Sequence, residues 1–156
     1  KRQTRWAALL LPLGEDGTRK ALKRLKCSNA VIDGVSTLVK EKAPRTPPST
    51  LQAKRLLGKY DLHTVQQLTA LWSALQPERK DEFTDLQKEA ETLTAQSACC
   101  RVSQLAVNGR DLMAAGVAPG PGLRRALEAL LEEVITGRLP NEKAELLAFA
   151  AKFSAS

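Results

Sequence analysis

The amino-acid sequence predicts an all-α protein, a multi-helix array with a compact C-terminal helical tail. Apolar residues recur at spacings of three and four along nearly all of the 156 residues, which is the period of one helix face. Aromatic residues make up only 4% of the chain while Ala and Leu dominate, a balance that favours helices over sheets. No segment carries a strong strand signal.

Two helices are predicted before the first long break. The first covers about residues 3–13, and its inward stripe is expected to be Trp6, Leu9, Leu10 and Leu13. Gly14 is expected to stop it, because glycine readily ends a helix. The second covers about residues 18–25, with the inward positions Ala21, Leu22 and Leu25.

The middle of the chain predicts four more helices around a proline-rich loop. Ser28 is a favourable N-cap for a helix over 29–40. Three prolines in the segment 43–50 exclude a helix there, because each removes a backbone donor and clashes with the preceding turn. The helices expected after this loop are 51–58, closed by Gly58, then one capped by Asp61 that reaches about Leu75, then 79–98.

The last third of the chain differs in composition, and it predicts short helices and a connection rich in glycine and proline. Asn108 is expected to cap a short helix, and the segment 116–122 forms a tight connection. Pro121 suits the first turn of the next helix, which should reach Ile135, because the missing N–H is not needed there. A final helix is expected from Glu142 to about Phe153.

Positive charge is concentrated in the first part of the chain. Residues 1–60 carry 14 Lys and Arg against 4 Asp and Glu, whereas residues 61–156 carry 10 against 13, within a formal net charge of +7. This asymmetry indicates a polyanionic partner such as nucleic acid. The basic face of the predicted helix 18–25 also includes Arg19. The residues predicted to contact RNA on this face and just after it are Lys20, Lys23, Arg24 and Lys26. An ordinary solvated helix face is the alternative interpretation.

A second candidate site lies where the glycine-rich connection meets the helix that begins at Pro121. Glycines there would let a phosphate approach backbone N–H groups at a helix N-terminus, where the macrodipole favours an anion. The residues predicted to bind RNA backbone at this point are Arg110, Gly120, Gly122, Arg124 and Arg125, with Gly116 in the same connection. The alternative is a helix–helix corner whose glycines only permit close packing.

The sequence offers no candidate catalytic or metal-binding residues. Its one histidine, His63, has no Cys, Asp or Glu at metal-ligand spacing, and Glu132 and Glu133 diverge around a helix. Phosphate-binding, serine-hydrolase and zinc-protease motifs are absent. An odd number of cysteines, Cys27, Cys99 and Cys100, favours a reduced, cytoplasmic protein, and no apolar run is long enough to span a membrane.

The segment that begins Leu105-Ala-Val-Asn-Gly-Arg-Asp-Leu-Met and continues through Pro119-Gly-Pro-Gly-Leu-Arg-Arg closely resembles the C-terminal region of bacterial CCA-adding enzymes. These enzymes are tRNA nucleotidyltransferases of the poly(A) polymerase family. The resemblance continues through Leu139-Pro-Asn-Glu-Lys-Ala-Glu-Leu-Leu. Upstream, Arg5-Trp-Ala-Ala-Leu-Leu and Leu25-Lys-Cys-Ser-Asn-Ala-Val-Ile resemble the helical body of the same enzymes.

The resemblance implies that catalysis belongs to an N-terminal head, which carries a Gly-Ser motif and an Asp-x-Asp metal pair that this sequence lacks. Glu15-Asp-Gly-Thr-Arg19 matches the spacing by which the family selects CTP or ATP. We interpret the match as coincidental, because it follows the body helix and contains Gly17. Where many relatives carry His-Asp, this sequence has Leu11-Pro12, which excludes that metal site here.

These implications define the expected protein. A body-like region (1–98) and a tail domain (99–156) would hold tRNA backbone, while the head of the same polypeptide would extend the 3′ end with Mg²⁺ and CTP or ATP. No cofactor is expected in this chain, which should be inactive alone. The alternative is a stand-alone helical scaffold used for protein–protein contacts.

Overall fold

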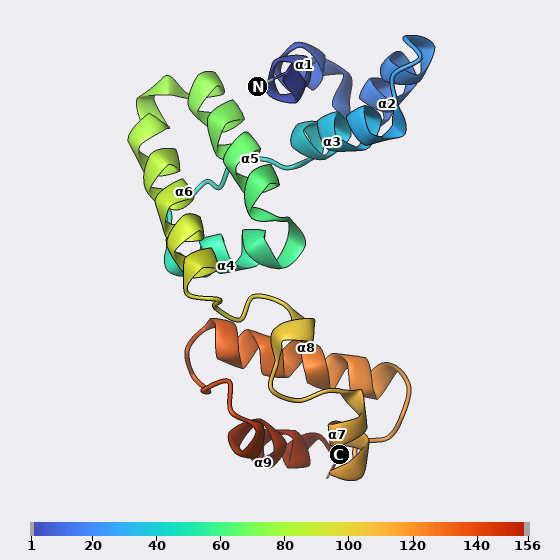
Figure 1. The fold of residues 1–156 in the computed structure, drawn as a ribbon, viewed down its shortest axis with the longest axis vertical. Coiled ribbons are helices and arrows are strands. Elements are labelled where there is room, and N and C mark those ends of the chain that lie inside the picture. Colours follow the sequence, from blue (N-terminus) through green and yellow to red (C-terminus); the bar gives the residue numbers. More distant parts are fainter. Residues whose placement is uncertain (1, 155–156) are drawn as a thin grey trace.

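The computed structural model describes residues 2–154, with side chains described for residues 2–152. Every regular element within this part is a helix, which confirms the all-α prediction (Figure 1). Short 3₁₀ turns occupy Leu11–Leu13, Pro77–Arg79 and Val102–Gln104. The α-helices are α1 (Arg2–Leu10), α2 (Gly14–Arg24), α3 (Asn29–Lys40), α4 (Thr50–Lys59), α5 (Leu62–Leu75), α6 (Lys80–Ala95), α7 (Gly109–Ala114), α8 (Pro121–Ile135) and α9 (Lys143–Ser154).

The first six helices enclose one hydrophobic core, which we call the body core. Within it α2 packs on α3, α1 on α3 and α5, and α6 on both α4 and α5. The rings of Trp72 and Phe83 lie with their centroids 5.8 Å apart at its centre. The other large side chains that are fully buried here are Leu22, Leu38, Leu68, Leu71 and Leu86.

The last three helices, which lie below the others in Figure 1, enclose a second core, the tail core. Its most buried side chains are Leu112, Ala126, Leu130, Leu146 and Ala150. Asn141 closes the loop before α9: its side-chain oxygen accepts from the N–H of Ala106 at 2.8 Å, and its amide donates to the Gln104 carbonyl at 2.9 Å. None of the helices in the described part of the chain has the length and apolar character that a membrane span requires.

Several helix ends lie where the sequence predicts them. The Asp61 carboxylate accepts from the N–H of Thr64 at 2.9 Å at the start of α5. Asn108 caps α7, Pro121 is the first residue of α8, and α3 spans the predicted 29–40. Polar side chains at an N-cap act locally, so such ends can be predicted without knowledge of the tertiary structure.

Other expectations about the first helices were wrong. The inward face of α1 carries Ala7 and Leu10, while Leu9 is 70% exposed and Leu13 is 53% exposed. Periodicity shows which residues share a face, but two adjacent faces of α1 are apolar and only one is covered. Leu25 is also exposed, because α2 ends at Arg24.

Two glycines behave differently from the prediction. Gly14, at a φ of +65°, turns the chain directly from the first helical segment into α2, which therefore begins four residues earlier than expected. Gly58 is the penultimate residue of α4, which ends one residue later than predicted, at Lys59. A Cβ on Gly58 would come within 2.7 Å of the Cys100 carbonyl oxygen, so the glycine permits a close approach of two backbone segments.

Candidate nucleic-acid interface

The predicted basic residues on α2 form an exposed strip, which we call the α2 strip and which consists of Lys20, Lys23, Arg24 and Lys26. The first three occupy positions i, i+3 and i+4, so they share one face of the helix. Lys26 follows the end of α2 at a φ of +55°. All four side chains are exposed, and they lie close together in the sequence at and after the C-terminal half of α2.

None of the four cations of the α2 strip has an ion-pair partner among the described residues. Arg19, in contrast, donates to Asp33 at 2.7 Å and lies 3.6 Å from Glu15, which also pairs with Lys40. The sequence alone could not separate Arg19 from its neighbours. The structure divides the basic segment into one arginine that serves the fold and four cations available to an anion.

The second predicted site lies at the N-terminus of α8. Gly120, at a φ of +116°, occupies the N-cap and provides no side-chain acceptor. Pro121 has no N–H, and the N–H groups of Leu123 and Arg124 donate to the Gly120 carbonyl, so among the described residues the Gly122 N–H is the first-turn amide without a backbone acceptor. A Cβ on Gly122 would meet nothing within 4 Å, which leaves this turn open. The structure therefore requires glycine at 120 for its backbone conformation, whereas no packing contact requires glycine at 122.

Arginines surround this helix start. Arg125 is exposed and has no ion pair within the described residues, while Arg124 is 84% exposed and holds Glu128 at 2.9 Å. The start of α7 lies beside the same turn, because Gly109 approaches the Leu123 side chain. The fold thus brings the backbone of Arg110 near the turn that carries Arg124 and Arg125.

The nearby acid Asp111 is already engaged. Its carboxylate accepts from Lys143 at 2.7 Å and from the N–H of Asn108 at 3.0 Å. The Lys143 hydrogen bond, followed by that of Asn108, lowers the pKa of Asp111. Its negative charge is therefore balanced within the tail instead of opposing an anion at α8.

Figure 1 shows α2 and α8 in different parts of the molecule. The predicted residues therefore form two separate surfaces, the α2 strip on the body and the α8 start on the tail. Their role in binding RNA stays a prediction.

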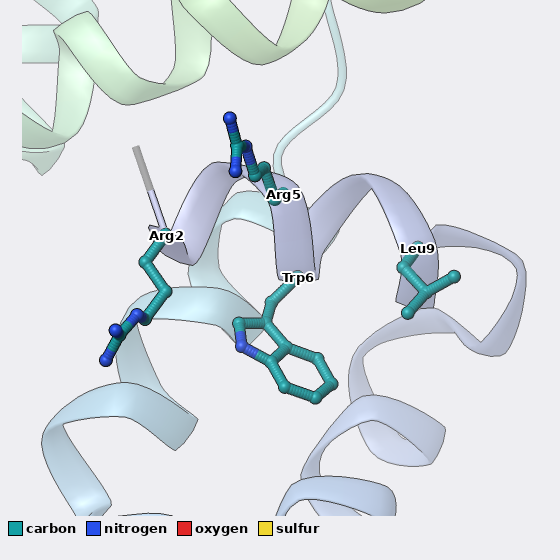
Figure 2. A pocket seen from close by; sticks show the side chains of 4 residues that line it. All are labelled: Arg2, Arg5, Trp6 and Leu9. Carbon is teal, nitrogen blue, oxygen red and sulfur yellow. The ribbon is translucent and has the colours of Figure 1, made fainter.

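A third surface lies on α1, where Trp6 and Leu9 were both predicted to face the core. Trp6 is partly buried against the body core, whereas Leu9 is exposed. Arg2, Arg5, Trp6 and Leu9 line a cavity of about 510 Å³ on the outer side of α1. Figure 2 shows the Trp6 indole and the Arg2 side chain extending from one side of α1 and Arg5 from the opposite side. Neither arginine has an ion pair among the described residues. The clue to this surface was available in the sequence, since Arg2 and Arg5 directly precede the apolar stripe and lie at helical spacing from Trp6 and Leu9.

Comparison with known proteins places this helical chain in an established class. Residues 1–150 match the family described as "tRNA nucleotidyltransferase domain 2 putative". The chain therefore belongs to this tRNA nucleotidyltransferase domain family, and it corresponds to the C-terminal region of CCA-adding enzymes. No solved structure matches it significantly.

Two similar relatives cover nearly the whole chain. A CCA-adding enzyme of Lacticaseibacillus paracasei is 32% identical over 149 residues, which is 96% of this chain and 35% of that protein. A CCA-adding enzyme of Limosilactobacillus fermentum is 32% identical over 150 residues, 94% of this chain and 35% of the relative. A CC-adding tRNA nucleotidyltransferase of Shouchella clausii is 53% identical over 47 residues, 30% of this chain and 12% of that protein. The chain spans about a third of the length of the relatives that it matches along its whole length.

Proposed function

We propose that this chain is the tRNA-binding body and tail of a CCA-adding tRNA nucleotidyltransferase. It would hold the tRNA backbone while a head in the same polypeptide extends the 3′ end. The observation that carries the proposal is the set of four exposed, unpaired cations on α2 in a chain of this family. The start of α8 supports it with the N–H of Gly122 and the exposed side chain of Arg125.

Backbone contacts suit this partner. An RNA duplex hides its base edges in a deep, narrow major groove, so proteins recognise its shape and its phosphates. Cations on a helix face and amides at a helix N-terminus both bind phosphate without reading sequence. This is the chemistry expected of a protein that must bind many different tRNAs.

The exposed surface of α1 fits the proposal that a second domain packs against it. Exposed leucines next to two unpaired arginines fit a protein surface that is apolar with an acidic edge. The head would cover Leu9 and Leu13 and would supply the groups that bind Mg²⁺ and CTP or ATP. We therefore expect no nucleotide addition when this chain alone is incubated with tRNA, CTP, ATP and Mg²⁺. Incorporation of nucleotide would refute the assignment of catalysis to the head.

The same α1 surface also fits the second candidate function, a helical scaffold that binds other proteins. The two functions differ in which cations contribute to tRNA binding. Neutralising phosphates releases counterions, so tRNA affinity should fall steeply, by a slope of about 0.9 per contact or less, as salt rises. A scaffold with this net positive charge would also bind tRNA non-specifically, but its affinity would depend no more on the α2 strip than on other exposed cations.

The experiment is a titration of labelled tRNA with this chain at about 50 and about 200 mM salt. Reversing Lys20, Lys23 and Arg24 to Glu should lower the affinity and flatten its salt dependence. The control reverses Lys80, Lys88 and Arg138, which lie on α6 and after α8, and should change the affinity far less. Equal losses in both variants, or no binding by the wild-type chain, would contradict the proposal.

The tail contacts need their own variant. Replacing Arg124 and Arg125 with Ala should weaken tRNA binding and leave the fold intact, because both side chains are exposed. The matched variant Glu128→Ala removes the partner of Arg124 and should leave the affinity unchanged or raise it. Unchanged affinity in the double arginine variant would remove the α8 start from the binding surface.

A further inference from the structure

The body core and the tail core are joined by a short segment of chain that includes the 3₁₀ turn Val102–Gln104. The body core ends with Cys100, the tail core begins at Val107, and they share no residue among those described. Cys99 packs against the tail core, while its neighbour Cys100 is buried in the body core. Such alternation is expected where the backbone is extended. Apolar burial therefore holds each part together, while the contacts between the parts include the buried Ile135, which belongs to neither core, and a set of polar side chains.

Helix α4 touches both parts. Its apolar side chains Ala53, Leu56 and Leu57 are buried in the body core. Its basic side chains turn to α8: the Lys54 ammonium donates to the Ile135 carbonyl at 3.2 Å, and the Arg55 guanidinium donates to Glu132 at 2.7 Å. Ile135 is the last residue of α8, so Lys54 also lies at the negative end of that helix dipole.

Arg101 binds the other end of α4. Its Nε donates to the Leu57 carbonyl and a terminal nitrogen donates to the Tyr60 carbonyl, each at 2.9 Å. The Gln104 side-chain oxygen accepts from the N–H groups of Cys100 and Arg101, which holds the segment in shape. We call Lys54, Arg55 and Arg101 together the polar joint.

We propose that the polar joint positions the tail against the body, so that the α2 strip and the α8 start reach one RNA molecule together. This inference rests on the proposed function. Two surfaces that bind one rigid ligand act cooperatively only when their spacing matches that of the ligand. An RNA duplex presents its phosphates at a fixed spacing and does not adapt to a loose pair of surfaces. Lys54, Arg55 and Arg101 are thus positioning residues.

The test breaks and then rebuilds one contact of the joint in the full chain. Arg55→Glu places two carboxylates opposite each other, and the swap Arg55→Glu with Glu132→Arg restores the pair with its charges exchanged. Small-angle X-ray scattering should give a longer maximum dimension for Arg55→Glu and the wild-type value for the swap. The affinity for tRNA should fall by about tenfold or more in Arg55→Glu and recover in the swap.

A matched control is Lys88→Glu, which makes the same change of charge at a pair with Asp85 that lies within α6. Lys88→Glu should leave the maximum dimension unchanged. It should lower the affinity for tRNA only as much as the reversal of any other surface charge does. If the swap restores the maximum dimension but not the affinity for tRNA, Arg55 itself contacts RNA, and the positioning role is overturned. Unchanged scattering in Arg55→Glu would also overturn it. If the wild-type chain binds no tRNA, the proposed function fails while the scattering still decides whether the joint fixes the tail.

Discussion

The backbone N–H of Cys27 donates to the carbonyl of Leu22 at 3.1 Å, across the end of α2. The N–H of Lys26 donates to the Lys23 carbonyl in the same turn, which completes a Schellman motif. This arrangement places Lys26 at a φ of +55°, a conformation that glycine adopts without strain and lysine does not. One cation of the α2 strip is therefore held at a small cost in stability.

Replacing Lys26 with Gly should stabilise the fold, by about 1 kcal/mol, because it removes that strain. It should also weaken tRNA binding modestly, since one cation is lost. The matched variant Lys20→Gly removes the same charge from the interior of α2 and should destabilise the fold by about 0.5–1 kcal/mol. Urea unfolding measures the change in the free energy of unfolding for both variants. A change of the same sign in the two variants would disprove the strain at Lys26.

Gly122 offers a way to separate the two interpretations of the glycine-rich corner. A Cβ at this position meets no atom within 4 Å, so Gly122→Ala should leave the fold unchanged or stabilise it by up to about 1 kcal/mol, through helix propensity. If phosphate approaches the backbone here, the added methyl group should weaken tRNA binding. A stabilised protein with unchanged tRNA affinity would favour a purely structural corner.

The N-cap at Asp61 predicts a pH dependence of stability. Hydrogen bonds from the Thr64 side chain and backbone N–H lower the pKa of Asp61. Because the pKa in the folded state lies below the unfolded value, the stabilisation is complete at neutral pH and is lost as the pH falls through the carboxyl range. Asp61→Ala should cost about 1 kcal/mol at pH 7 and progressively less as the pH falls below the ordinary carboxyl pKa of 3.8. Denaturant unfolding at neutral pH and below that pKa is the measurement, and an equal cost at both would contradict the role of the ionised cap.

The prediction from sequence succeeded where local chemistry decides the structure and failed where tertiary contacts decide it. Asp61, Asn108 and Pro121 act on their own turns, so the helix starts could be predicted. Leu9 could not be placed, because an apolar residue next to a buried face is equally compatible with a core or with an uncovered surface. The same limit applies to the candidate sites: charge located the α2 strip, but only the structure shows that Arg19 is already paired.

Gly58 and Cys100 give the last prediction, because they connect α4 to the segment between the two cores. In an ordinary helix interior, Gly→Ala stabilises a protein by about 0.5–1 kcal/mol. At Gly58 the new Cβ would lie 2.7 Å from the Cys100 carbonyl oxygen, and that oxygen belongs to backbone that cannot turn away like a flexible side chain. Gly58→Ala should therefore destabilise the protein and displace the tail. Urea unfolding measures the first effect and small-angle scattering the second, and a stabilised protein with wild-type dimensions would show that the approach of α4 to Cys100 is not needed.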